Sequence, residues 1–169
     1  MSNFCTLPPE GGTATVGQGP ALLLLHVNDS TDDQVLFQAA CKRARVPVNW
    51  HVTDCATKAI SYLHTLVRQS KTHDVHWPDL VLLDIVMPGE SGFEVLKYMR
   101  RTPELLDTPV VIFTGHDRSD FQKEATRLKA DHYMTKPQVF EKTVEIARTI
   151  YALYGTRKRP GSASGQAAG

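Results

Sequence analysis

Short apolar segments alternate along the chain with longer segments of helical periodicity. Five short segments are apolar throughout or alternate apolar and polar residues: 22–27, 48–52, 80–83, 110–113 and 132–135. Such short runs are typical of strands, and a run that is apolar throughout indicates a strand buried on both faces of a sheet.

Between these segments, apolar residues recur every three or four positions, which predicts amphipathic helices. The predicted helices cover about 32–44, 55–68, 93–100, 117–129 and 140–154. Five strands that alternate with five helices predict an α/β fold in which helices cover both faces of a parallel sheet.

The two ends of the chain lack this alternation. Residues 1–20 are rich in Gly, Thr and Pro, and residues 155–169 are basic and then rich in Gly, Ser and Ala. We expect both to be flexible tails around one domain at 21–154. A chain of 169 residues with 41% hydrophobic content suits one domain of this size.

Charge and cysteine content limit the partners and the cellular location that we expect. A net charge of +1 gives no reason to expect nucleic acid or a membrane surface as the main partner. The longest apolar run, 21–27, is too short to span a bilayer, and no basic cluster precedes it as in a secretory signal. Three cysteines without C-x-x-C spacing favour a reduced, cytoplasmic location.

Polar residues follow four of the predicted strands, and in an open parallel sheet such positions converge. These residues are Asn28-Asp29, Asp84, Thr114 and Lys136. Carboxylates and backbone carbonyls can hold Mg²⁺, and an ionised carboxylate can attack phosphorus. Lys136 and Thr114 would then stabilise the phosphoryl oxygens.

Segment 78–92 resembles the phosphorylation loop of response-regulator receiver domains, which act in two-component systems. Thr114 and Lys136 follow Asp84 at the spacing that this family has. The resemblance covers about 21–154 and implies a doubly wound, flavodoxin-like sheet in the strand order 2-1-3-4-5.

The resemblance also implies a role for each matching residue. Asp84 resembles the phospho-acceptor, Thr114 the switch hydroxyl, and Lys136 the lysine that pairs with the phosphoryl group. Asp29 and Asp84 resemble Mg²⁺ ligands, and Val86 resembles the position that binds the metal through its backbone carbonyl. The remaining matches are the aromatic switch Tyr133, the loop residues Met87, Pro88, Gly89 and Gly92, and Pro137, which in this family usually follows a cis peptide bond.

Two positions modify this picture. The family usually has two acids after the first strand, whereas this chain has Asn28, which can bond a metal-bound water but brings no charge. We therefore expect weaker Mg²⁺ binding. Val86 and His116 occupy the positions that help set how fast the acyl phosphate hydrolyses. Because valine cannot orient a water molecule, we expect a long-lived phosphoryl group.

The resulting prediction is a stand-alone response regulator. It would accept a phosphoryl group on Asp84 from a sensor histidine kinase or a phosphotransfer protein, catalyse its own phosphorylation and dephosphorylation, and switch a protein-interaction surface. The few residues after 154 leave no room for a helix-turn-helix output domain. The downstream protein is not identified by the sequence, and a homodimer is left open.

Alternatives are distinguished by single residues. A pseudo-receiver that binds proteins without being phosphorylated is favoured by Asn28 alone. A phosphatase of the haloacid-dehalogenase type would need an acid at Val86, and a flavodoxin would need a phosphate-binding loop where residues 28–33 are acidic. Asp29 could also simply cap a helix, and Tyr133 could be a core aromatic.

Overall fold

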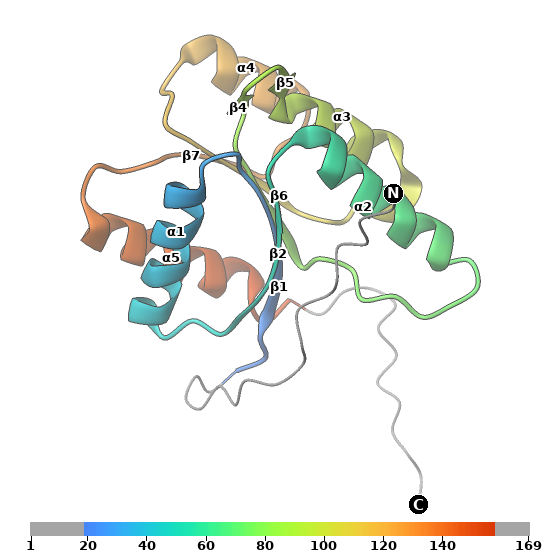
Figure 1. Cartoon of the computed structure of the whole chain (residues 1–169), viewed down its shortest axis with the longest axis horizontal. Helices are drawn as coiled ribbons and strands as arrows, with labels where there is room; N and C mark the ends of the chain where they lie inside the picture. Colours follow the sequence, from blue (N-terminus) through green and yellow to red (C-terminus); the bar gives the residue numbers. More distant parts are fainter. Residues whose placement is uncertain (1–18, 158–169) are drawn as a thin grey trace, which may run out of the picture.

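The centre of the molecule is a parallel five-stranded sheet with the strand order β2-β1-β3-β6-β7 (Figure 1). Its strands are β1 (Leu22–Val27), β2 (Val48–Thr53), β3 (Leu80–Leu83), β6 (Val110–Thr114) and β7 (His132–Thr135). Counted along the chain, this is the flavodoxin-like order 2-1-3-4-5, so the predicted fold class is confirmed.

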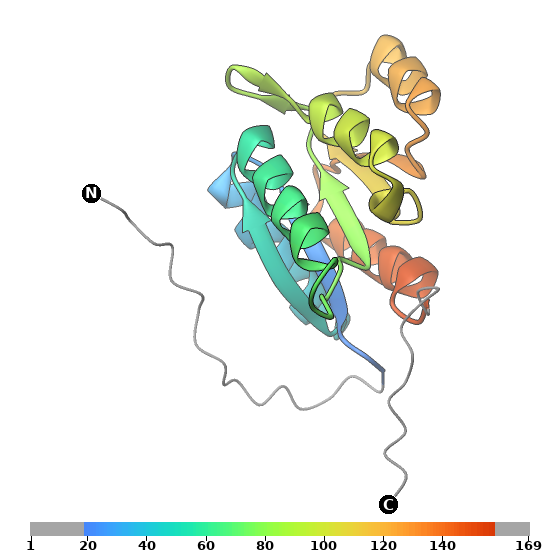
Figure 2. The ribbon, with the colours of Figure 1, turned by 90° about the vertical axis from the view of Figure 1, so that its right-hand side faces the viewer.

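Helices cover both faces of the sheet (Figure 2). Helices α1 (Thr31–Ala44) and α5 (Phe140–Tyr154) pack together on one face. The other face carries α2 (Ala56–Gln69), α3 (Gly92–Arg101) and α4 (Ser119–Arg127). Figure 2 shows α2 and α3 in front of the sheet, with α1 and α5 behind it.

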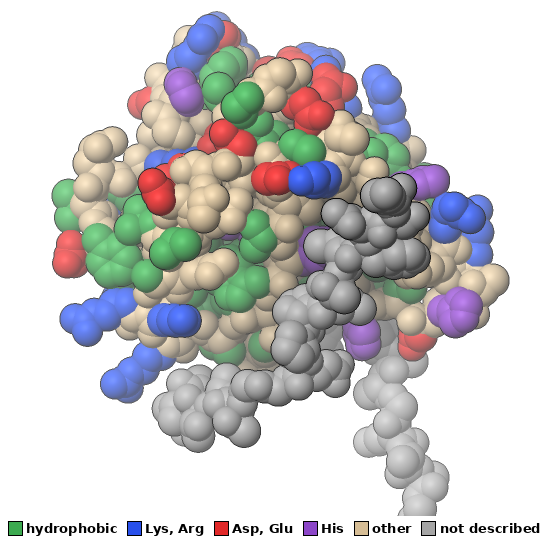
Figure 3. All heavy atoms as spheres, viewed as in Figure 1, with side chains coloured by type: hydrophobic (Ala, Val, Ile, Leu, Met, Phe, Trp, Pro, Cys, Tyr) green, Lys and Arg blue, Asp and Glu red, His purple; other side chains and the backbone are tan. Residues whose placement is uncertain are grey.

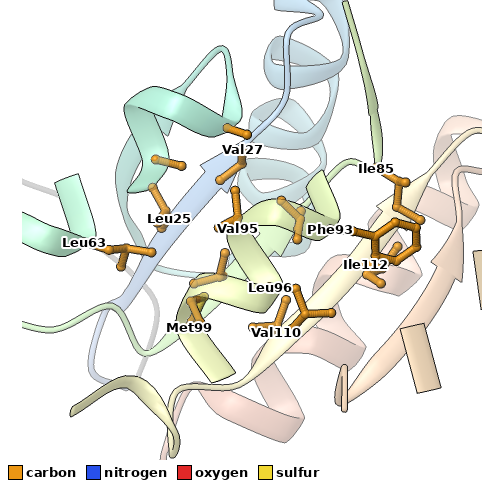
Figure 4. Close-up of a cluster of buried hydrophobic side chains, with 14 of the residues drawn as sticks. Leu25, Val27, Leu63, Ile85, Phe93, Val95, Leu96, Met99, Val110 and Ile112 are labelled. Atoms are coloured by element: carbon orange, nitrogen blue, oxygen red, sulfur yellow. The ribbon is translucent and has the colours of Figure 1, made fainter. Parts of the chain in front are cut away.

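Alternation of side chains along the strands gives the sheet two hydrophobic cores. One core, beneath α2 and α3, takes every second strand residue and is shown in Figure 4. Its strand residues are Leu25, Val27, Val81, Leu83, Val110 and Ile112. The core beneath α1 and α5 contains the strand residues that point to the opposite face, including Leu22, Leu24, Leu80, Leu82, Val111 and Phe113. Because both faces are covered, the strands β1, β3 and β6 are apolar except for His26 in β1 and Thr114 at the end of β6.

The structure adds two short elements that the sequence pattern did not predict. A hairpin of β4 (Val86–Met87) and β5 (Glu90–Ser91) follows β3, and the 3₁₀ turn η1 (Pro103–Leu105) follows α3. Strands of two residues are too short to show alternation. The hairpin turns through Gly89, whose φ of 73° lies in the left-handed region that favours glycine.

The computed structural model describes residues 19–157, so the predicted tails at 1–20 and 155–169 lie almost wholly outside the described residues. None of the helices within 19–157 has the length and apolar composition needed to cross a bilayer. On the face seen in Figure 3, acidic and basic side chains lie together over the upper half, and basic side chains gather at the lower left.

Candidate functional site

Three of the polar residues that follow the strands line one pocket at the carboxyl edge of the sheet. Asp29 after β1, Asp84 after β3 and Lys136 after β7 border a pocket of about 480 Å³, together with Val86 and Gly115. The predicted convergence is therefore confirmed for these three charged residues, whereas Asn28 and Thr114 are buried and do not line the pocket. Gly115 leaves the space beside it open, because a Cβ there would have no atom within 4 Å.

Asp84 is buried and its carboxylate is bonded at both oxygens. The Lys136 ammonium donates to Oδ2 at 2.5 Å, and the Val86 backbone N–H donates to Oδ1 at 3.3 Å. Only 7% of Asp84 is exposed. A buried carboxylate is stable only when charges and hydrogen bonds compensate it, and here an ammonium and an N–H group do so.

Lys136 has a second acidic partner that the sequence analysis did not single out. Its ammonium also donates to Oδ2 of Asp33, at 2.7 Å, from the first turn of α1. The sequence pattern indicates only an acidic helix start, and Asp33 is 103 residues away from Lys136 in the chain. The one local signal is its position four residues, or about one helical turn, after Asp29.

Asn28 is built into the turn between β1 and α1. Its Oδ1 accepts the backbone N–H of Ser30 at 2.9 Å, and its backbone oxygen accepts the Gln34 side chain at 2.6 Å. The side chain is buried, and its Nδ2 has no hydrogen-bond partner among the described residues. Asn28 therefore acts first as a turn residue, and the predicted contact with metal-bound water stays a prediction.

The two predicted switch residues, Thr114 and Tyr133, both bond the backbone of His116. Thr114 is fully buried, and its Oγ1 accepts the His116 backbone N–H at 3.4 Å. The Tyr133 hydroxyl donates to the His116 backbone oxygen at 2.5 Å. Partial burial raises the pKa of the Tyr133 hydroxyl, so it stays protonated and able to donate. The loop after β6 is thus attached to both residues.

The expected cis peptide bond before Pro137 is not observed, because no cis bond occurs among residues 19–157. The Lys136 backbone N–H bonds the Thr114 oxygen at 2.7 Å, which continues the β6–β7 pairing past the end of β7. From there the lysine side chain reaches Asp84, while the peptide bond between Lys136 and Pro137 is trans. Trans is the lower-energy isomer of an X–Pro bond, so this geometry does not need the cis form.

Two sets of contacts hold the loop that carries Val86 in place. The Glu90 carboxylate accepts the Thr57 backbone N–H at 2.9 Å and the Thr57 hydroxyl at 2.6 Å, which ties the β4–β5 hairpin to the first turn of α2. In the second set, Gly92 lies so close to Asp84 that a Cβ would overlap the Asp84 backbone oxygen. These contacts hold the backbone on both sides of Val86.

His26 lies buried in β1 near the site and is packed between aromatic rings. Its ring centroid is 5.8 Å from that of Phe37 and 6.2 Å from that of Trp50. Burial, together with the positive charge of Lys136, lowers the pKa of His26 to about 4. The imidazole is therefore neutral at pH 7 and adds no cation that would compete with Lys136.

The donor atoms at this edge suit a hard dication. Asp29 and Asp84 bring carboxylate oxygens, Val86 brings a backbone carbonyl, and all three residues line the same pocket. No group of three or more His, Cys, Asp or Glu side chains that could hold a metal ion occurs within residues 19–157. Mg²⁺ binds through one or two carboxylates and completes its shell with water and phosphate oxygens, so the donor set fits Mg²⁺.

Comparison with known proteins agrees with this geometry. The family model for the response regulator receiver domain matches residues 27–148. The phosphate regulon transcriptional regulatory protein PhoB of Escherichia coli K12 is 39% identical over 61 residues, which are 36% of this chain and 27% of PhoB. The match thus spans about a quarter of PhoB. The response regulator Rcp1 of Synechocystis sp. is 25% identical over 135 residues, which are 80% of this chain and 90% of Rcp1.

Solved structures give the same result for the fold. The phosphorylated cyanobacterial phytochrome response regulator RcpA has a TM-score of 0.70 at 25% identity, over 84% of this chain and 99% of RcpA. The Mn²⁺-bound form of Rcp1 has a TM-score of 0.68 at 24% identity, over 83% of this chain and 99% of Rcp1.

Replacement of Gly92 tests how tightly the loop is held. In Gly92→Ala the new methyl group must displace the Asp84 backbone, so we expect the free energy of unfolding to fall by about 1–3 kcal/mol. Chemical denaturation measures this. Gly115→Ala is the matched control, since a Cβ there meets no atom within 4 Å. Equal stability of the two variants would contradict the close approach at Gly92.

Proposed function

The chain belongs to the response regulator receiver family, and we propose that it is a phosphorylation-operated switch with Asp84 as the acceptor. Receiver domains are signalling switches that interact with histidine kinases or phosphotransfer proteins. The observation that carries the proposal is the buried Asp84 carboxylate, paired with Lys136 at 2.5 Å in a pocket that Asp29 and Val86 also line.

The proposed reaction uses Asp84 as a nucleophile that needs no general base. A carboxylate oxygen forms a bond to phosphorus while the bond from phosphorus to the donor's leaving group breaks. The donor is the phosphohistidine of a sensor kinase or phosphotransfer protein. Lys136 lies beside Asp84 and would pair with the phosphoryl oxygens, while the Val86 N–H keeps the carboxylate oriented.

Receiver domains bind Mg²⁺ or Mn²⁺ at the phosphorylation site. In this chain Asp29, Asp84 and the Val86 carbonyl would hold Mg²⁺, with Asn28 contributing through a bound water. The ion would neutralise negative charge on the transferring group. The β4–β5 hairpin supports this role for Val86, because the bonds between Glu90 and Thr57 hold its backbone in place.

The proposed output is a change in the surface around α4, β7 and α5. Thr114 and Tyr133 both bond the backbone of His116, so a new partner for the Thr114 hydroxyl would compete with one of the two bonds at His116. Phosphorylation would shift the balance between two loop conformations by binding one of them better. The likeness to Rcp1 over 90% of its length supports a stand-alone regulator.

One rival function keeps a specific observation in its favour. A pseudo-receiver that binds proteins without accepting phosphate is supported by the uncharged Asn28. Steady phosphatase turnover is disfavoured, because the position that would carry the acid is Val86, whose side chain cannot transfer a proton.

Phosphorylation is tested with acetyl phosphate. Incubation with this donor should add one phosphoryl group to the protein when Mg²⁺ is present, and intact mass reads the adduct. Asp84→Asn should abolish it, because an amide is a poor nucleophile. Asp107→Asn is the control: Asp107 is exposed in the loop before β6, at the other edge of the sheet, and should label normally. An unlabelled wild-type protein beside a labelled control receiver would favour the pseudo-receiver.

Asn28→Asp should tighten Mg²⁺ binding by about fivefold or more, because it adds negative charge facing the cation. The new carboxylate can keep the hydrogen bond from the Ser30 N–H, and its second oxygen replaces the buried Nδ2 that lacks a partner among the described residues. Calorimetric titration with MgCl₂ measures the dissociation constant. Unchanged or weaker binding would rule out a charge deficit at position 28.

The phosphoryl group on Asp84 should persist for minutes or longer after the donor is removed. The Val86 side chain is 43% exposed at the pocket and has no polar atom that could orient an attacking water. Val86→Asn provides such a group and should shorten the lifetime several-fold, followed by intact mass over time. Loss of the phosphate from the wild type within seconds would contradict this expectation.

A further inference from the structure

Lys136 sits between two carboxylates of different exposure. Its ammonium donates to Asp84 at 2.5 Å and to Asp33 at 2.7 Å. The side chains of Asp84, Lys136 and Asp33 are 9%, 16% and 38% exposed, so the Lys136–Asp33 pair is more shielded than an ordinary surface ion pair. Because one ammonium is shared, its attraction to Asp33 weakens its hold on Asp84.

The turn before α1 explains why Asp33 is free to reach Lys136. Ser30 is the N-cap of α1, and Asp33 is the third helical residue. An acid at that position often bonds back to the N-cap N–H. Here Asn28 Oδ1 already accepts the Ser30 N–H at 2.9 Å, so the Asp33 carboxylate is available to Lys136.

The charges of the pocket show what this arrangement achieves. Three carboxylates, on Asp29, Asp33 and Asp84, and the one ammonium of Lys136 leave a formal net charge of −2. A receiver site with two acids after the first strand, one acceptor and one lysine has the same net charge. Asp33 thus restores the charge that is lost at Asn28.

We propose that Asp33 is a positioning residue of the phosphorylation site. It shares the Lys136 ammonium with Asp84 and supplies the negative charge that Asn28 does not bring toward Mg²⁺. The inference rests on the proposed function, since it concerns the same pocket. Asn28 and Asp33 divide two tasks: Asn28 closes the turn, and Asp33 carries the charge.

A competing role for Asp33 is stabilisation of the α1 N-terminus through the helix dipole. Asp32 provides the matched control, because it is acidic, lies in the same first turn and is exposed, yet does not line the pocket. Asp32→Asn and Asp33→Asn remove the same charge from the same helix end. Only the second variant removes the ion pair with Lys136.

The test is calorimetric titration of the full chain with MgCl₂. Asp33→Asn should weaken Mg²⁺ binding about three- to tenfold, because a charge is lost and Lys136 competes more strongly for Asp84. Asp32→Asn should stay within about twofold of wild type, since exposed charges are screened by solvent. The double variant Asn28→Asp with Asp33→Asn should return to near the wild-type dissociation constant. A merely structural role of Asp33 would not be rescued at position 28.

Each outcome decides between the proposals. Equal effects of Asp32→Asn and Asp33→Asn, or an unchanged dissociation constant in Asp33→Asn, would overturn the role of Asp33 and leave the proposed function intact. A wild-type protein that binds no Mg²⁺ would defeat the proposed function, and this inference with it. Thermal unfolding of each variant confirms that it is folded, and Asp33→Glu, which keeps the charge, should bind Mg²⁺ more tightly than Asp33→Asn.

Discussion

The ion pair between Lys136 and Asp84 constrains the rest of the site. The two residues follow β7 and β3, which are separated in the sheet by β6, so the lysine must reach across the end of a strand. Burying this pair costs solvation free energy. The cost is offset because Val86 and Asp33 provide further polar contacts, and because parallel strands bring their carboxyl ends to one edge.

Two polar side chains near this pair, His26 and Thr114, add no charge to it. His26 is buried close by, but with a pKa of about 4 it is neutral at pH 7. Thr114 is buried and uncharged, and its hydroxyl is bonded to backbone. The electrostatics of the pocket therefore depend on three carboxylates and one ammonium, and a single acid changes the balance. In the proposed site, Asn28 and Asp33 are therefore linked through the net charge of the pocket, although they bond different atoms.

The sequence predicted the sheet, the five helices and the convergence of Asp84 and Lys136, because strands buried on both faces give a strong apolar signal. It missed the β4–β5 hairpin, whose strands are only two residues long. It also missed the contacts of Asp33 with Lys136 and of Glu90 with Thr57, which join residues 103 and 33 positions apart and leave no local pattern. The cis bond expected before Pro137 came from resemblance, and the structure has a trans bond there.

A chain of contacts leads from the pocket to the surface beside α4. Thr114 lies at the end of β6, the His116 backbone bonds both Thr114 and Tyr133, and the His116 ring packs 6.4 Å from that of Phe121 in α4. These two hydrogen bonds attach the start of the loop between β6 and α4 to β6 and β7. In the proposed switch, a change in the partner of the Thr114 hydroxyl would reach α4 through His116, because this residue contacts both Thr114 and Phe121.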